Sequence, residues 1–189
     1  TCEYKRDYSI VTAWGFSSKG GSDPGITSGV VNIFSTYGAF AALKSDGSVQ
    51  AWGSSYNGGT DPGITSGVVN IFSTEYAFAA LKSDGSVVVW GDSSSRGTTG
   101  ESIASQLKNV VEITSTDSAF AALKSDGSVV TWGRADWGNF LSSDAYSQTQ
   151  SGVKKIFSTV SAFAALKEDG SVVTWGSDLT GGDSSTVAS

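Results

Sequence analysis

Apolar residues in this chain fall into short runs that recur in the same order. Four times, a run rich in Val, Ile and Phe or Thr ends in Ser-Thr, and Ala-Phe-Ala-Ala-Leu and then Ser-Val with a closing Trp-Gly follow. Short runs of β-branched and aromatic residues are typical of strands rather than helices. The pattern therefore predicts three strands per repeat. First strands are expected at 30–36, 68–74, 110–116 and 153–159, second strands at 39–43, 77–81, 119–123 and 162–166, and third strands at 48–53, 86–91, 128–133 and 171–176.

A polar turn separates the second and third strands of each repeat. Its sequence is Lys-Ser-Asp-Gly in three copies and Lys-Glu-Asp-Gly in the last. Asp-Gly between two apolar runs indicates a hairpin, because Gly tolerates the positive φ of a tight turn. One Asp per turn does not supply the converging oxygen ligands of a calcium site, so no metal is expected here. The predicted structural turn residues are Asp46, Gly47, Asp84, Gly85, Asp126, Gly127, Asp169 and Gly170.

The second strand is apolar at every position, which predicts neighbours on both of its faces. An antiparallel strand with one wet face would alternate apolar and polar residues. Repeats of about 40 residues whose strands are covered on both sides are typical of stacked blades. The predicted fold is therefore all-β, a β-propeller of repeated antiparallel blades with three to four strands each. The expected core residues are Phe40, Phe78, Phe120, Phe163, Trp52, Trp90, Trp132 and Trp175.

Both ends of the chain resemble parts of a repeat. Residues 4–15 align with a hairpin turn and third strand, which predicts a partial blade over 1–15, and the tail 177–189 resembles a linker leading into a missing blade. The hypothesis is a single repeat array over 1–189 that forms an incomplete portion of a ring of about seven blades. Full repeats are expected at about 30–53, 68–91, 110–133 and 153–176.

Leu-Lys-x-Asp-Gly-Ser-Val followed by Trp-Gly, four times in register, resembles the repeat of the regulator of chromosome condensation family. The short repeat is also similar to that of the propeller-type β-lactamase inhibitors, which have three-stranded blades. The resemblance covers residues 4–176 and implies a β-propeller. It implies little about function, because such propellers serve as exchange factors, photoreceptors, inhibitors and scaffolds. The chain has no His, so the His-containing signatures of chromatin-binding and ultraviolet-sensing relatives are missing, and nucleotide-exchange activity is not carried over.

Charge and residue content exclude several function classes. The net charge is −6, and the 12 basic residues are scattered, which disfavours nucleic acid and anionic membranes as partners. No apolar run approaches the roughly 20 residues of a membrane span. Without His, and with Cys2 as the single cysteine, the chain has no Ser-His-Asp triad, no His-based or four-cysteine zinc site and no internal disulfide. No phosphate-binding loop occurs, so neither a cofactor nor catalytic residues are predicted, and the chain is not expected to be an enzyme.

The candidate binding residues are those that differ between repeats whose scaffold is constant. They lie just before Ala-Phe-Ala-Ala-Leu or just after Trp-Gly, and repeat proteins build recognition surfaces in this way. Tyr, Trp and Arg are also enriched at binding hot spots. Trp137 is the leading candidate, because it breaks the repeat pattern and an exposed Trp is costly without a partner. Neutral variation at exposed turns is the alternative. The candidates are Tyr37, Tyr56, Glu75, Tyr76, Asp92, Asp117, Arg134, Asp136, Trp137 and Asp178.

These observations favour a non-catalytic protein-binding or scaffolding propeller, as a peripheral subunit or module of a larger assembly. The alternative is a carbohydrate-binding or adhesion propeller whose aromatic side chains stack on the sugar rings of a glycan. A propeller enzyme with its site outside this segment is the least favoured interpretation.

Overall fold

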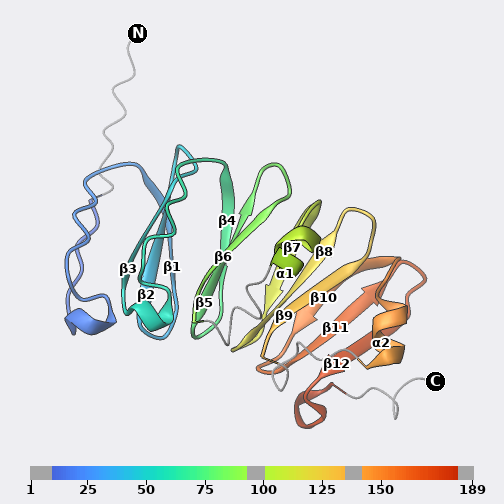
Figure 1. The fold of residues 1–189 in the computed structure, drawn as a ribbon. Helices are drawn as coiled ribbons and strands as arrows, with labels where there is room; N and C mark the ends of the chain where they lie inside the picture. The colour runs from blue at the N-terminus through green and yellow to red at the C-terminus, as the bar shows by residue number, and fades with distance from the viewer. Residues whose placement is uncertain (1–9, 93–100, 135–141, 183–189) are drawn as a thin grey trace.

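The computed structural model of the chain describes residues 10–92, 101–134 and 142–182, and they form four three-stranded antiparallel sheets (Figure 1). Each sheet contains three consecutive strands, so each sequence repeat folds into one blade. Blade 1 is β1 (Val30–Ser35), β2 (Ala39–Lys44) and β3 (Val49–Gly53), and blade 2 is β4 (Val68–Ser73), β5 (Ala77–Lys82) and β6 (Val87–Gly91). Blade 3 is β7 (Val110–Ser115), β8 (Ala119–Lys124) and β9 (Val129–Gly133), and blade 4 is β10 (Val153–Ser158), β11 (Ala162–Lys167) and β12 (Val172–Gly176).

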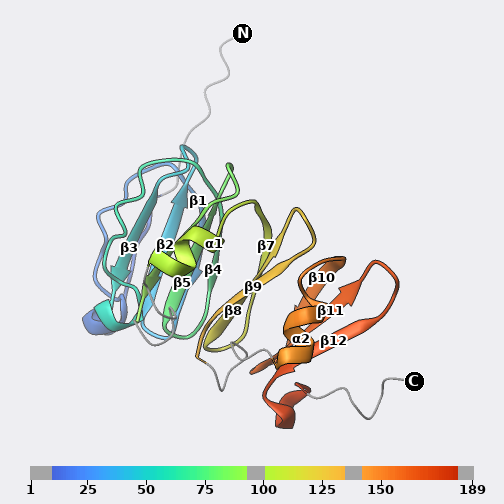
Figure 2. The same cartoon turned by 45° about the vertical axis from the view of Figure 1, so that its right-hand side comes forward.

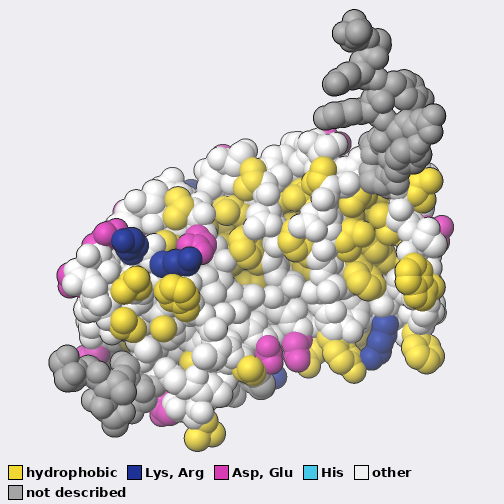
Figure 3. Space-filling model, turned by 180° about the vertical axis from the view of Figure 1, so that it is seen from behind, with side chains coloured by type: hydrophobic (Ala, Val, Ile, Leu, Met, Phe, Trp, Pro, Cys, Tyr) yellow, Lys and Arg dark blue, Asp and Glu magenta, His cyan; other side chains and the backbone are white. Residues whose placement is uncertain are grey.

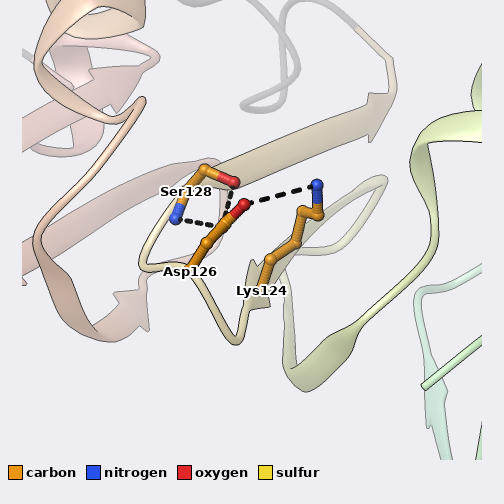
Figure 4. A network of polar contacts seen from close by, with 3 residues as sticks. All are labelled: Lys124, Asp126 and Ser128. Atoms are coloured by element: carbon orange, nitrogen blue, oxygen red, sulfur yellow. Dashed lines mark hydrogen bonds and ion pairs between the residues drawn. The ribbon is translucent and has the colours of Figure 1, made fainter. Parts of the chain in front are cut away.

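The Asp-Gly turn closes each hairpin through a local hydrogen-bond network, shown for blade 3 in Figure 4. The Asp126 carboxylate accepts hydrogen bonds from the Ser128 hydroxyl at 2.6 Å and from the Ser128 backbone N–H at 3.0 Å. The Lys124 ammonium lies 3.8 Å from the same carboxylate. These hydrogen bonds, with a smaller contribution from Lys124, lower the pKa of Asp126 below its ordinary value. The other three turns repeat the two hydrogen bonds from Ser to the carboxylates of Asp46, Asp84 and Asp169.

The blades stack through two unlike faces that the repeat supplies in alternation along each strand. In the interface between blades 1 and 2, the small face of β2, with Ala39, Ala41 and Leu43, packs against the Phe78 and Trp90 side chains of blade 2. Phe78 also stacks on Trp90 within its own blade, with ring centroids 5.1 Å apart. Alanines allow the sheets to approach closely, and the aromatic rings fill the wider space. This pairing of faces explains why the middle strand is apolar at every position.

Backbone hydrogen bonds also connect neighbouring blades at the hairpin end. The Val68 N–H of β4 donates to the Gly47 carbonyl in the turn of blade 1, at 3.0 Å. A Cβ on Gly47, which has φ +77°, would lie 2.6 Å from the Gly67 backbone nitrogen. The turn therefore needs Gly both for its conformation and for the approach of the next blade.

The linkers between blades are of two kinds. The short linkers begin with 3₁₀ turns, η1 (Ser17–Lys19) and η2 (Ser55–Asn57), and the carbonyls of Gly20 and Gly58 accept hydrogen bonds from the Trp52 and Trp90 indoles. The longer linkers contain helices that the sequence analysis did not predict, α1 (Glu101–Gln106) and α2 (Ser143–Gln148). Another 3₁₀ turn, η4 (Asp178–Thr180), follows blade 4.

The four blades form an open arc, as the two views in Figures 1 and 2 show. The first strands lie next to one another on the inner side of this arc. The β-propeller fold class is confirmed, and the ring is not closed by the described residues. An incomplete blade over 1–15 and a tail leading into a missing blade stay predictions, because 1–9 and 183–189 lie outside the described residues.

Candidate functional site

The turns between the first and second strands of the four blades have a common structure. In each, a Thr follows the first strand, and its hydroxyl oxygen accepts a hydrogen bond from the backbone N–H of the Ala that begins the second strand. The Thr74 oxygen, for example, lies 3.0 Å from the Ala77 nitrogen. The two residues after each Thr vary between repeats. A constant hydroxyl thus holds the backbone while the neighbouring side chain differs.

Backbone hydrogen bonds join these variable positions into a row. The Tyr37 N–H donates to the Glu75 carbonyl at 2.9 Å, the Glu75 N–H to the Asp117 carbonyl at 2.8 Å, and the Asp117 N–H to the Val160 carbonyl at 3.0 Å. We call Tyr37, Glu75, Asp117 and Val160 the rim. Four positions that are about 40 residues apart in the sequence therefore lie side by side at one end of the inner strands.

The rim borders an open cavity of about 590 Å³. Its remaining walls are Ser and Thr residues that end the first strands, including Ser73, Thr74 and Ser115. The Ser115 hydroxyl donates to the Ser73 carbonyl of the preceding blade at 2.8 Å, which fixes the spacing of the walls. The Tyr37 side chain is 65% exposed, so its ring is available to a ligand.

Glu75 contributes to the pKa shifts of two neighbouring residues. Partial burial, and then the negative charge of Glu75, raise the pKa of Asp117 above its ordinary value. A hydrogen bond to Glu75, and then its charge, raise the pKa of Tyr76. Arg134 opposes this effect on Tyr76. The cavity thus has two interacting carboxylates on one wall, which favours a cationic group in the space between them.

The candidates that follow Trp-Gly lie beside the same turns. The Asp92 N–H donates to the Tyr76 carbonyl and the Arg134 N–H donates to the Ser118 carbonyl, both at 2.9 Å. Both sets of variable positions therefore lie at one end of the blades. Tyr56 in η2 and Asp178 in η4 do not line the cavity. Asp136 and Trp137, which include the leading candidate, lie outside the described residues.

Two kinds of site are not found in the part of the chain that the structure describes. It contains no group of three or more Cys, Asp or Glu side chains arranged to hold a metal ion. It also contains no helix with the length and apolar character needed to cross a membrane.

No protein-family profile and no curated protein matches the sequence. Solved structures do match. Human WBSCR16 has 23% identity and a TM-score of 0.55, over 78% of this chain and 47% of that one. Prp20p of Saccharomyces cerevisiae, the yeast RCC1, has 19% identity and a TM-score of 0.53, over 78% of this chain and 43% of that one. The fold is that of a β-propeller, similar to the fold of these proteins.

A third structure similar to this propeller is the CRINKLY WD40 ectodomain of the Arabidopsis thaliana receptor kinase ACR4. It has 15% identity and a TM-score of 0.51, over 87% of this chain and 60% of that one. The present chain spans less than half the length of WBSCR16 or Prp20p. At these identities the likeness concerns the fold alone.

Sequence reasoning missed two residues of this propeller that support the rim. Lys19 and Asn57 occupy equivalent positions in η1 and η2. The Lys19 ammonium lies 4.0 Å from the centre of the Tyr37 ring, and the buried Asn57 amide donates to the Glu75 carbonyl at 3.2 Å. Alignment of the two short linkers, which are nearly identical after their Gly-Gly pairs, would have shown that these positions correspond.

Proposed function

We propose that this chain is a non-catalytic propeller module that binds a protein partner through the rim, as a peripheral part of a larger assembly. The observation that carries the proposal is the row formed by Tyr37, Glu75, Asp117 and Val160 around one cavity. A constant scaffold that presents different side chains at adjacent positions is how repeat proteins form concave recognition surfaces.

The chemistry of the rim favours a partner that presents a basic side chain. Carboxylates form strong charge-assisted hydrogen bonds with Lys and Arg, and the face of a Tyr ring attracts a cation. The Tyr37 ring already has the Lys19 ammonium over it, at 4.0 Å. We therefore infer that Glu75 and Asp117 receive a Lys or Arg of the partner, with Tyr37 and Tyr76 beside it. Prp20p, which shares the fold, has been studied for its binding to Gsp1p and histones, and this supports a protein as the class of partner.

The test is capture of partners from native extract by the immobilised chain, followed by measurement with the purified partner. The Glu75→Gln/Asp117→Asn variant is expected to lose about 10-fold or more in affinity, since hydrogen bonds to charged groups contribute roughly 1.5–3 kcal/mol each. The wild-type affinity should also fall as salt is raised.

A matched control carries the same change of net charge far from the rim. Asp144→Asn/Glu168→Gln alters two exposed carboxylates, in α2 and in the turn of blade 4, and should bind like the wild type. An equal loss of affinity in both variants would show that the effect comes from net charge and not from the rim. A glycan-array signal with no captured protein would contradict the proposal and favour the carbohydrate-binding alternative.

A further inference from the structure

A polar cavity lies beside blade 3, between the helices of the two longer linkers. The helix α1 packs through Ile103 into the interface between blades 2 and 3, and α2 packs through Ala145 into the interface between blades 3 and 4. The two helices therefore lie on either side of blade 3 (Figures 1 and 2). The cavity between them has a volume of about 450 Å³, and its walls include Lys108, Asn109, Lys124, Tyr146 and Gln150.

Two adjacent walls of this cavity differ from the repeat. Asn109 precedes the first strand of blade 3, where the other blades have Gly29, Gly67 and Gly152, and Lys108 stands where they have Ser. Asn109 has φ +56°, and it is the one residue other than Gly with a positive φ in the described ranges. Gly adopts this conformation at lower cost than Asn. A side chain that is kept despite such a cost indicates a function for it.

Asn109 also occupies space that the turn lysine takes in another blade. In blade 2, the Cε of Lys82 lies 3.0 Å from the place that a Cβ on Gly67 would take. In blade 3 the Cβ of Asn109 fills the equivalent place. Lys124, the equivalent lysine, lines the cavity, and its ammonium lies 3.8 Å from the Asp126 carboxylate. The side chain of Lys124 is only 22% exposed, so its charge is partly withdrawn from water.

Two ammonium groups at this cavity are available to a ligand. Lys167 of blade 4 donates to the Gln148 carbonyl at 2.8 Å, whereas the ammonium of the equivalent Lys124 donates no hydrogen bond to a described residue. Lys108 is exposed, and its ammonium contacts no described hydrogen-bond or ion-pair partner. None of the described residues that line the cavity is Asp or Glu, although Asp126 lies beside it. In the view of Figure 3, by contrast, several basic side chains lie close to acidic ones. The cavity is therefore locally positive in a chain whose net charge is −6.

We propose that this cavity binds a small molecule that carries a phosphate monoester and hydroxyl groups, such as a sugar phosphate. The ammonium groups of Lys108 and Lys124 bind the phosphate through charge-assisted hydrogen bonds. The Asn109 amide and the Tyr146 hydroxyl supply donors and acceptors for the hydroxyl groups. The volume of about 450 Å³ is within the range of about 300–1,000 Å³ that is usual for small-molecule sites. This site is distinct from the rim and does not depend on the proposed function.

The test is calorimetric titration of glucose phosphate into the full chain, which should give saturable binding that weakens as salt is raised. Glucose and inorganic phosphate should each bind about 10-fold more weakly or less, because each supplies only one of the two kinds of contact. No saturation at about 10 mM glucose phosphate, or equal affinity for inorganic phosphate, would overturn the proposal. Tighter binding of a phosphoserine peptide would overturn the assignment to a small molecule.

Three protein variants locate the site. Lys108→Gln removes an exposed ammonium without a described partner, so the fold should persist, and affinity for glucose phosphate should fall about 10-fold. Asn109→Gly introduces the residue of the other blades at a φ that suits it, so the fold should again persist while affinity falls. The control Lys154→Gln makes the same change of charge at an exposed position in β10 and should bind like the wild type. Full affinity in Lys108→Gln, or an equal loss in Lys154→Gln, would overturn the proposal.

Discussion

Equivalent residues of the repeat are buried to different extents in the interface between blades 2 and 3 and on the outer face of blade 1. Phe120 and Ile113 of blade 3 are 0% and 3% exposed because blade 2 covers them. In blade 1, residues 10–29 cover only part of Phe40 and Ile33. A repeat thus specifies half of each interface, and its stability depends on the neighbour that supplies the other half.

Replacement of the repeated Phe should give the largest difference in stability loss between the two regions. Phe120→Ala should lower the free energy of unfolding by about 3–5 kcal/mol, because it leaves a cavity in a closed interface. Phe40→Ala should cost roughly half as much, because the ring is only partly buried. Urea unfolding followed by circular dichroism gives both values. Equal losses would contradict the difference between the two regions.

The turn glycines compare the first blade, whose turn contacts the start of blade 2, with the last described blade. Gly47→Ala should cost roughly 2–4 kcal/mol, because a left-handed conformation is strained with a Cβ and the Cβ would contact the Gly67 backbone. Gly170 has φ +85° with nothing within 4 Å of a Cβ, so Gly170→Ala should cost about 1 kcal/mol, the strain alone. Thermal unfolding of the two variants measures the contribution of the next blade.

A smaller change tests the same comparison at the Ile position. Ile71→Val should lower stability by about 0.5–1.5 kcal/mol, since the removed methylene is fully buried. Ile33→Val should have a smaller effect, because its side chain is 43% exposed. Urea unfolding of the two variants measures both losses. An equal loss in both variants would contradict the difference in burial between the two Ile side chains.

The smallest expected effect concerns the Asp turns, where replacement of the Asp should change stability by the same amount in different blades. Hydrogen bonds from Ser lower the pKa of Asp126 and of Asp169 below 3.8 in the folded chain. A lowered folded pKa gives stability that is present above the unfolded pKa and lost as pH falls through the folded value. Asp126→Asn and Asp169→Asn should therefore reduce the melting temperature equally at about pH 7, and the difference from wild type should shrink below about pH 3.8. Unequal losses would show that a neighbouring blade contributes to these turns.

The sequence was sufficient for the strands and the hairpins, because both are local. Runs such as Ala-Phe-Ala-Ala-Leu and the Asp-Gly turn determine their own structure with few distant contacts. The different burial of Phe40 and Phe120 was not predictable from identical repeats, since it depends on the neighbouring blade. Nor were α1 and α2, because the longer linkers have no second copy with which to compare them.

The rim was predictable in part. Tyr37, Glu75 and Asp117 were identified by their variation within a constant frame. That they line a single cavity depends on the adjacency of the inner strands, which only the folded arrangement shows. Val160 was not among the predicted residues because an aliphatic side chain carries no chemical signal of binding. Lys19 and Asn57 were missed because they act on the rim from the preceding linkers.

The row of hydrogen bonds from Tyr37 to Val160 uses main-chain atoms only. These hydrogen bonds therefore do not depend on which side chains occupy the four positions. The exception is Pro at 37, 75 or 117, which would remove the donating backbone N–H. The side chain at each of these four positions can therefore be replaced independently of the other three. A library randomised at 37, 75, 117 and 160 would sample many recognition surfaces on one unchanged frame.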